Sequence, residues 1–164
     1  MSAKKILVVE DHAATLKFLS QKLKSHGYEV VGAADSAEAV AAVRQAHPDL
    51  IVLDLNLRTN PLFGGAQWDA FGMLAWLKRN QADKPIPTVV LTSPDQANLK
   101  QKALDAGALA HFQKPPRDKD FFEVIDSALG QTGATSTVPA TTTLPIPPAT
   151  SLTPNPPPPP SRAA

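Results

Sequence analysis

Five short apolar segments rich in branched side chains recur along the first 130 residues, and segments with helical spacing separate them. The apolar segments are residues 4–11, 28–34, 50–55, 88–92 and 108–113. Runs of this length and composition are typical of strands that are buried on both faces. Because strands that alternate with helices pair in parallel through right-handed crossovers, the pattern predicts a doubly wound α/β domain with a five-stranded parallel sheet.

Local signals mark where two of the helices begin. Asp35, with Glu38 three residues later, has the form of a capping box. Ser93 precedes Pro94, and an N-cap residue before a proline predicts a helix start. We expect one continuous helix from there to Gly107, where a glycine supplies the stop.

The composition changes sharply after Gly130. Residues 131–164 hold ten of the 17 prolines, eight threonines and a single charged residue, Arg162. Such a segment cannot bury an apolar core, and its run of prolines at 156–160 favours polyproline II or coil. We therefore predict a folded domain over residues 1–130 and a disordered Pro/Thr-rich tail, which is either a segment without a specific partner or a docking peptide for a proline-binding groove.

The composition also excludes several classes of function. The absence of cysteine excludes a disulfide framework, a thiolate metal site and a thiol nucleophile. Lys and Arg total 16 against 15 Asp and Glu, so the chain lacks the positive field of a non-specific nucleic-acid binder. No apolar run approaches the roughly 18 residues that span a membrane, and the first residues enter a strand rather than a signal peptide. We expect a cytoplasmic protein.

Polar side chains stand at the carboxyl ends of the predicted strands, which is the edge where parallel α/β sheets bind ligands. These residues are Glu10, Asp11, Asp54, Thr92 and Lys114. Carboxylate oxygens are the ligands that Mg²⁺ prefers, and a hydroxyl and a lysine can face a phosphate. An acid pair, a third acid, a hydroxyl and a lysine at one edge predict phosphoryl transfer to a carboxylate.

Residues 4–130 resemble a receiver domain of a two-component response regulator. The resemblance rests on five short segments: Val8-Val9-Glu10-Asp11, Leu53-Asp54, Leu91-Thr92-Ser93, Ala106-Gly107-Ala108 and Lys114-Pro115. It implies a flavodoxin-like fold of the receiver type. It also implies a stand-alone signalling domain that accepts a phosphoryl group from a histidine kinase or phosphotransfer protein and catalyses only its own phosphorylation and dephosphorylation.

The resemblance implies a role for each acid. Asp54 is expected to be the phosphoacceptor. Asp11, assisted by Glu10, is expected to hold Mg²⁺ together with Asp54 and the backbone carbonyl of Asn56. Because a carboxylate is repelled by an anionic phosphoryl donor, cations at this site have to offset the repulsion.

The resemblance also implies a switch. Thr92 is expected to bond a phosphoryl oxygen, and Lys114 to pair with the phosphoryl group or, at rest, with Asp54. The bond from Lys114 to Pro115 is expected to be cis. His111 occupies the position of the side chain that turns inward in receivers, although it could instead be an exposed edge-strand histidine without a role. The face from residue 95 to 130 is the expected contact surface for a downstream protein target.

Two departures from the family pattern stand out. Ala70, the best match to a small residue that opens the next helix, lies 16 residues after Asp54, so the intervening loop is about eight residues longer than usual. That loop either gates the site or is a tolerated insertion. No helix-turn-helix module follows Gly130, so direct DNA binding is not expected.

Three other functions are alternatives to a phosphorylated receiver. A pseudo-receiver that binds partners independently of phosphorylation is the main alternative, although the acid pair, acceptor, threonine and lysine are all present. A haloacid dehalogenase type of phosphatase carries Asp-x-Asp after its first strand, whereas Asp54-Leu55-Asn56 follows the third. A flavin-binding domain would need a phosphate-cradling loop after strand one, where Glu10-Asp11-His12 stands instead.

Overall fold

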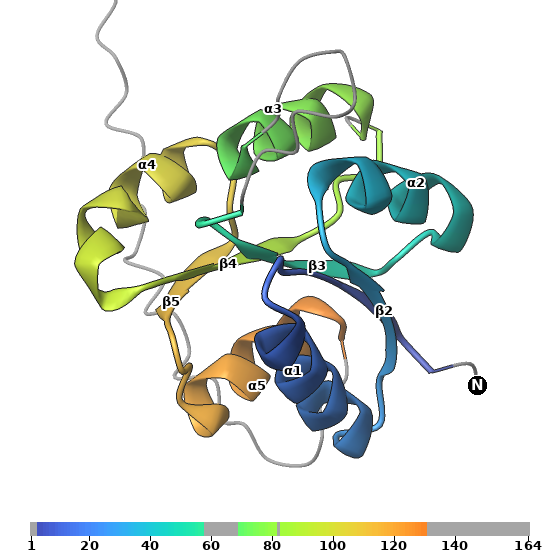
Figure 1. Cartoon of the computed structure of the whole chain (residues 1–164). Coiled ribbons are helices and arrows are strands. Elements are labelled where there is room, and N and C mark those ends of the chain that lie inside the picture. Colours follow the sequence, from blue (N-terminus) through green and yellow to red (C-terminus); the bar gives the residue numbers. More distant parts are fainter. Residues whose placement is uncertain (1–2, 58–68, 82, 131–164) are drawn as a thin grey trace, which may run out of the picture. The chain divides into compact units, whose positions relative to one another are not determined.

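A computed structural model gives the structure of the chain and describes residues 3–57, 69–81 and 83–130 (Figure 1). The strands are β1 (Lys5–Val9), β2 (Glu29–Ala33), β3 (Leu50–Asp54), β4 (Thr88–Thr92) and β5 (Ala110–Gln113). The helices are α1 (Ala13–Ser25), α2 (Ser36–Ala46), α3 (Ala70–Asn80), α4 (Lys100–Asp105) and α5 (Asp118–Ala128), with a 3₁₀ helix η1 (Pro94–Leu99) before α4.

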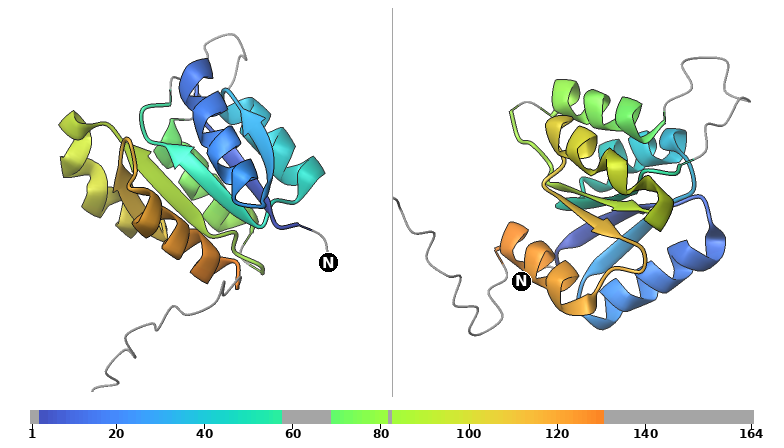
Figure 2. Two further views of the ribbon diagram at one scale, coloured as in Figure 1. Left: turned by 90° about the horizontal axis from the view of Figure 1, so that it is seen from below. Right: turned by 90° about the vertical axis from the view of Figure 1, so that its left-hand side faces the viewer.

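All strand pairs are parallel, and the order in the sheet is β2-β1-β3-β4-β5. Helices α1 and α5 cover one face, and α2, α3 and α4 cover the other (Figures 1 and 2). This is the doubly wound α/β sheet that the sequence predicts. The strand order reverses between β1 and β3, so the carboxyl ends of these two strands border the crevice where such sheets bind ligands.

The sheet separates two apolar clusters, and alternate residues of each strand feed one or the other. In β1, Ile6 and Val8 pack with α1 and α5, whereas Leu7 and Val9 pack with α2 and α3. The strands β3 and β4 alternate in the same way and are buried along their whole length. Burial on both faces explains why these segments read as continuous apolar runs in the sequence.

The N-cap bond expected at the start of α2 is confirmed, and the reciprocal bond of the capping box is made one residue earlier than in its standard form. Asp35 accepts a hydrogen bond of 2.8 Å from the backbone N–H of Glu38, and the Glu38 carboxylate accepts one of 2.8 Å from the N–H of Ala34. Asp69 caps α3 in the same way, since its side chain accepts a bond of 2.8 Å from the N–H of Gly72. Local side-chain chemistry therefore fixes both helix starts.

The single helix expected from Pro94 to Gly107 was wrong. The segment is the 3₁₀ helix η1 followed by α4, with a break at Gln96 (φ −108°, ψ 17°). Ser93 occupies the N-cap position but makes no side-chain capping bond. The Gln96 side chain instead donates a hydrogen bond to Asn56. Sequence signals within the helix cannot predict this tertiary contact.

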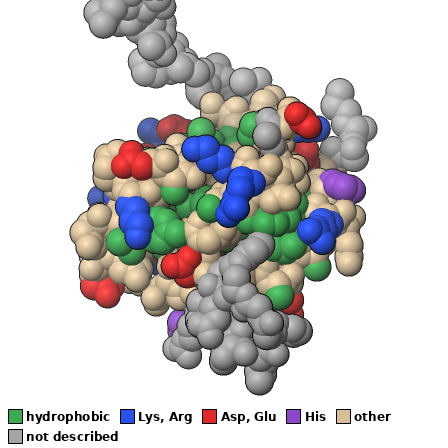
Figure 3. Space-filling view, turned by 90° about the horizontal axis from the view of Figure 1, so that it is seen from above, with side chains coloured by type: hydrophobic (Ala, Val, Ile, Leu, Met, Phe, Trp, Pro, Cys, Tyr) green, Lys and Arg blue, Asp and Glu red, His purple; other side chains and the backbone are tan. Residues whose placement is uncertain are grey.

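Cationic side chains lie over aromatic ones on the face formed by α2, α3 and α4. The Nζ atom of Lys102 lies 4.3 Å from the centre of the Phe71 ring, and the guanidinium carbon of Arg44 lies 5.8 Å from that of Trp76. Lys and Arg side chains interspersed with hydrophobic ones are visible on this face in Figure 3. The aliphatic stems of these cations help to shield the apolar surface of α3 from water.

The predictions about the long loop after Asp54 and about the segment after Gly130 concern residues that the structure does not describe. The long loop is described only at Asn56 and Leu57, and residues 58–68 and 131–164 are not described. A folded domain over residues 1–130 and a disordered tail therefore stay predictions. Within the described part of the chain, no helix is long and apolar enough to cross a membrane.

Candidate functional site

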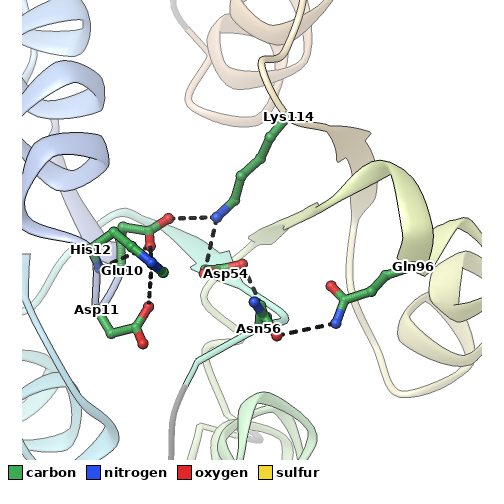
Figure 4. A network of polar contacts seen from close by, with 7 residues as sticks. All are labelled: Glu10, Asp11, His12, Asp54, Asn56, Gln96 and Lys114. Carbon is green, nitrogen blue, oxygen red and sulfur yellow. Dashed lines mark hydrogen bonds and ion pairs between the residues drawn. The ribbon is translucent and has the colours of Figure 1, made fainter.

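The acid pair lies immediately beyond β1, and the register of β1 with β3 brings it beside Asp54. Val9 pairs with Leu53, so the next residues of both strands emerge together at the edge of the sheet. Glu10 is 1% exposed, and its Oε2 accepts a hydrogen bond of 2.7 Å from Lys114 Nζ (Figure 4). Burial raises the pKa of the Glu10 carboxyl, and the charge of Asp54 adds to this rise, although Lys114 opposes it.

Asp54 ends β3 as a buried carboxylate with 1% exposure. Its Oδ1 accepts a hydrogen bond of 3.0 Å from the backbone N–H of Asn56. Its Oδ2 lies 3.0 Å from Lys114 Nζ as an ion-pair partner but accepts no hydrogen bond from the described residues. This oxygen is held by the ion pair alone and keeps acceptor capacity that a bound cation can satisfy.

Lys114 joins the two acids from the end of β5. Burial alone would lower the pKa of its ammonium group, but the contacts with Glu10 and Asp54 outweigh burial and raise the pKa above its usual value. The backbone N–H of Lys114 donates to the carbonyl of Thr92 at 2.8 Å, and the peptide bond to Pro115 is cis, as expected. Lys114 is therefore a charged group that is fixed at both its backbone and its side chain.

The alternation of the sheet explains why these three side chains converge. Each follows, by two residues, a side chain that packs on the α1 and α5 side: Val8, Val52 and Phe112. Because side chains two apart in a strand point to the same face, Glu10, Asp54 and Lys114 continue that direction at the edge of the sheet.

Thr92 and His111 form the second part of the site. Thr92 is fully buried at the end of β4, and its Oγ1 lies 2.6 Å from Nε2 of His111. His111 is half-buried and hydrogen-bonded, so it is not the exposed edge-strand histidine of the alternative interpretation. Burial lowers the pKa of His111, and the positive charge of Lys100 adds to this decrease.

Two further side chains at the site were missed in the sequence. His12 Nδ1 lies 3.1 Å from Asp11 Oδ1 and 3.4 Å from Glu10 Oε1. Its position directly after the acid pair was a usable signal. Gln96 Nε2 donates a hydrogen bond of 3.3 Å to Asn56 Oδ1, which is 40 residues away in the sequence. No local sequence pattern predicts that contact.

The family of the chain follows from comparison with known proteins. The family model of the response regulator receiver domain matches residues 6–126. The chain belongs to this family. The receiver is 28% identical over 127 residues to the polar-differentiation response regulator DivK of Brucella ovis, an alignment that covers 77% of the chain and 97% of DivK. A protein of Porphyridium aerugineum named "Probable transcriptional regulator ycf27" is 30% identical over 129 residues, and the receiver spans 49% of its length.

Solved structures agree with the family. The chemotaxis response regulator CheY4 of Vibrio cholerae superposes with a TM-score of 0.64 at 26% identity, covering 78% of this chain and all of CheY4. The receiver domain of NtrX from Brucella abortus superposes with a TM-score of 0.66 at 25% identity, covering 77% of this chain and 99% of that domain. The flavodoxin-like receiver fold expected from the resemblance is confirmed.

Receiver domains generally bind Mg²⁺ at an acidic cluster, and the described residues contain one. The ligand atoms of Glu10, Asp11 and His12 all lie within 4.8 Å of one another. The carboxylates of Glu10 and Asp11, together with that of Asp54, form the oxygen-rich donor set that suits Mg²⁺. The residues present therefore fit the ion, while the backbone carbonyl of Asn56 as a ligand stays a prediction.

Proposed function

We propose that this receiver accepts a phosphoryl group on Asp54 from the phosphohistidine of a histidine kinase or phosphotransfer protein. The observation that carries the proposal is the position of Lys114 Nζ, 2.7 Å from Glu10 and 3.0 Å from Asp54. A partly buried lysine between two buried carboxylates is a fixed positive charge at the point where negative charge accumulates during transfer.

The chemistry assigns a task to each residue. An oxygen of Asp54 attacks phosphorus, the new oxygen–phosphorus bond forms, and the phosphorus–nitrogen bond of the donor breaks. Lys114 moves its interaction from Asp54 to a phosphoryl oxygen and offsets the repulsion between the two anions. Mg²⁺, when bound by Asp11 and Asp54 with the assistance of Glu10, supplies further charge stabilisation to the transferring group.

The surface beside Lys114 gives a phosphohistidine donor a place to dock. An apolar pocket of about 390 Å³ is lined by side chains of α1 and by Pro115 and Pro116. Phe18 lines this pocket and is 50% exposed, which is unusual for a large apolar side chain. Apolar surface next to the reacting group suits a partner protein rather than a small polar donor.

Phosphorylation is converted into a change of protein contacts. The Thr92 hydroxyl donates a hydrogen bond to a phosphoryl oxygen, and His111 follows Thr92 because the two are bonded at 2.6 Å. His111 lies on β5, within the face from residue 95 to 130, so movement there alters the proposed target surface. We propose that the output is a protein contact rather than a DNA contact.

A pseudo-receiver that binds its partners without phosphorylation is the alternative function. Such a module has no need of two buried acids around one lysine, since burying these charges costs more than packing apolar side chains of similar volume. The retained charges therefore favour a phosphoacceptor. We also propose that the only reactions catalysed are phosphorylation and dephosphorylation of the receiver itself.

The test is incubation with acetyl phosphate, with and without Mg²⁺, followed by intact-mass measurement. We expect one added phosphoryl group in the presence of Mg²⁺ on the wild type and none on Asp54→Asn. The matched control is Asp105→Asn, which changes an exposed carboxylate on α4 and should be phosphorylated like the wild type. Labelling of Asp54→Asn at the wild-type level would refute the acceptor assignment.

A further inference from the structure

The hydrogen bond between Thr92 and His111 limits what Thr92 can do. Thr92 Oγ1 carries a single proton, so at any moment it donates to one acceptor only. At 2.6 Å, the partner of that oxygen at rest is Nε2 of His111. In the proposed function, the same hydroxyl has to donate to a phosphoryl oxygen on Asp54. When the His111 ring carries its proton on Nδ1, Nε2 is the acceptor, and the imidazole and the phosphoryl group compete for the one hydroxyl proton.

We propose that His111 is a positioning residue for the Thr92 hydroxyl and that it takes up a proton when Asp54 is phosphorylated. This inference rests on the proposed function. It adds to that function a coupling between phosphorylation and protonation of one identified side chain.

The resting state is set by the surroundings of His111. Ala110 and Phe112 face the α1 and α5 side, so the intervening His111 faces α4, as Thr92 does one strand away. Lys100 of α4 is the charged group that acts on the imidazole from that side, and its charge together with burial favours the neutral ring. A neutral ring with its proton on Nδ1 presents Nε2 as an acceptor for the Thr92 hydroxyl.

Other charged groups lie beyond Thr92, toward the acceptor site. Asp54 pairs with Leu91, the neighbour of Thr92 in β4, and Lys114 directly follows β5, the strand that contains His111. At rest the charge of Asp54 is paired with that of Lys114 at 3.0 Å. The aspartyl phosphate carries more negative charge than the free carboxylate, so with the same cations present in both states the local balance shifts toward stabilising a protonated imidazole.

The protons balance in the phosphorylated state. The Thr92 hydroxyl keeps its own proton and turns it toward the phosphoryl oxygen. His111 Nε2 binds a proton from solvent and donates it to the lone pair of Thr92 Oγ1, so the 2.6 Å contact persists with donor and acceptor exchanged. In this proposal one proton is taken up for each phosphoryl group, whereas a ring that only moved its proton from Nδ1 to Nε2 would take up none and would show no rise in pKa. By linkage, mild acid then favours the phosphorylated conformation as much as phosphorylation favours the protonated histidine.

The experiment is a pH titration of the full chain with ¹⁵N-labelled histidine, followed by NMR of the ring nitrogens. Each sample contains Mg²⁺ throughout and is measured before and after treatment with acetyl phosphate, and intact mass reports the phosphorylated fraction. Before treatment we expect a neutral His111 with its proton on Nδ1 at pH 7.5. After treatment we expect its pKa to rise by about one unit, a tenfold gain in proton affinity.

The chain supplies its own controls. His47 directly follows α2 and precedes β3, so it lies at the opposite edge of the sheet from Thr92, and its ring signals serve as the internal reference. The variant His111→Asn identifies the His111 signals by their loss. Thr92→Ser retains the hydroxyl and should retain most of the rise in the His111 pKa on phosphorylation. Thr92→Val lacks the hydroxyl and should lose most of that rise.

The outcomes distinguish failure of the proposed proton uptake by His111 from failure of the proposed phosphorylation of Asp54. Phosphorylated protein whose His111 pKa is unchanged overturns the coupling and leaves the phosphoacceptor assignment intact. An equal rise in Thr92→Val shows that the charge acts directly through space and overturns the positioning role. If no phosphoryl group is added to the wild type, the proposed function fails and the inference falls with it.

Discussion

The ammonium group of Lys114 lies 3.0 Å from Oδ2 of Asp54, and both side chains are largely withdrawn from solvent. The same ammonium group donates to the buried carboxylate of Glu10. One cation therefore holds two buried acids together at the edge of the sheet. The consequences for stability, metal binding and protonation follow from this arrangement.

Replacing Lys114 with methionine should weaken both the fold and the chemistry. The substitution keeps the length of the side chain but leaves two buried carboxylates without their cation. Losing one partner of a fully buried pair costs about 3–5 kcal/mol, and the 22% exposure of the Lys114 side chain reduces this to about 2 kcal/mol. Urea unfolding measures the change, and acetyl phosphate labelling should become at least tenfold slower. Lys24→Met, on the exposed surface of α1, is the matched control, and equal behaviour of the two variants would argue against a role for Lys114.

Replacing Asp11 with asparagine should weaken binding of Mg²⁺. The change removes one charge from the cluster of Glu10, Asp11 and His12 and leaves the apolar core untouched. We expect at least a tenfold loss of Mg²⁺ affinity by isothermal titration calorimetry. His12→Ala should change Mg²⁺ affinity much less, because this ion prefers oxygen ligands. If Asp11→Asn binds Mg²⁺ with wild-type affinity, the assignment of the metal site to the acid pair is wrong.

The stability of the receiver should depend on pH through His111. Its pKa is lower in the folded chain than the usual 6.5, so the folded state binds fewer protons than the unfolded state near that pH. Stability is then complete above pH 6.5 and declines as the pH falls below it. Urea unfolding between pH 7.5 and 5.5 should show a smaller loss for His111→Gln than for the wild type. If the wild type loses no more free energy of unfolding than His111→Gln between these pH values, the predicted destabilisation by protonation of His111 is wrong.

Most of the fold and the core of the site could be predicted because they are encoded locally. Apolar runs mark strands that are buried on both faces, and polar residues at the ends of four of the five runs mark the functional edge. The register of β1 with β3 then places Glu10 beside Asp54. The strand pattern and the order of a doubly wound sheet were therefore enough to predict five site residues: Glu10, Asp11, Asp54, Thr92 and Lys114.

The features that escaped prediction depend on contacts between distant segments. The break at Gln96 accompanies a bond to Asn56, and nothing within the 94–107 segment signals that partner. His12 was a different omission. It follows the acid pair directly, but only the folded backbone shows that its ring nitrogen approaches both Glu10 and Asp11.

Deleting residues 131–164 should leave the melting temperature nearly unchanged. A Pro/Thr-rich segment buries little apolar surface, so its removal takes few stabilising contacts away. Differential scanning calorimetry of the chain ending at Gly130 measures this. A fall of more than about 4 °C, which corresponds to roughly 1 kcal/mol in a domain of this size, would show that the segment contributes to the fold.

The central claim is that the carboxylate of Asp54 becomes covalently phosphorylated. Borohydride reduces an acyl phosphate to an alcohol, so it converts a phosphorylated aspartate to homoserine. The direct measurement treats the wild-type chain with acetyl phosphate and Mg²⁺, reduces it with borohydride, and locates homoserine by peptide mass spectrometry. The account predicts homoserine at position 54 alone. Homoserine at another acid, or none in a protein that carries the added phosphoryl mass, would contradict it.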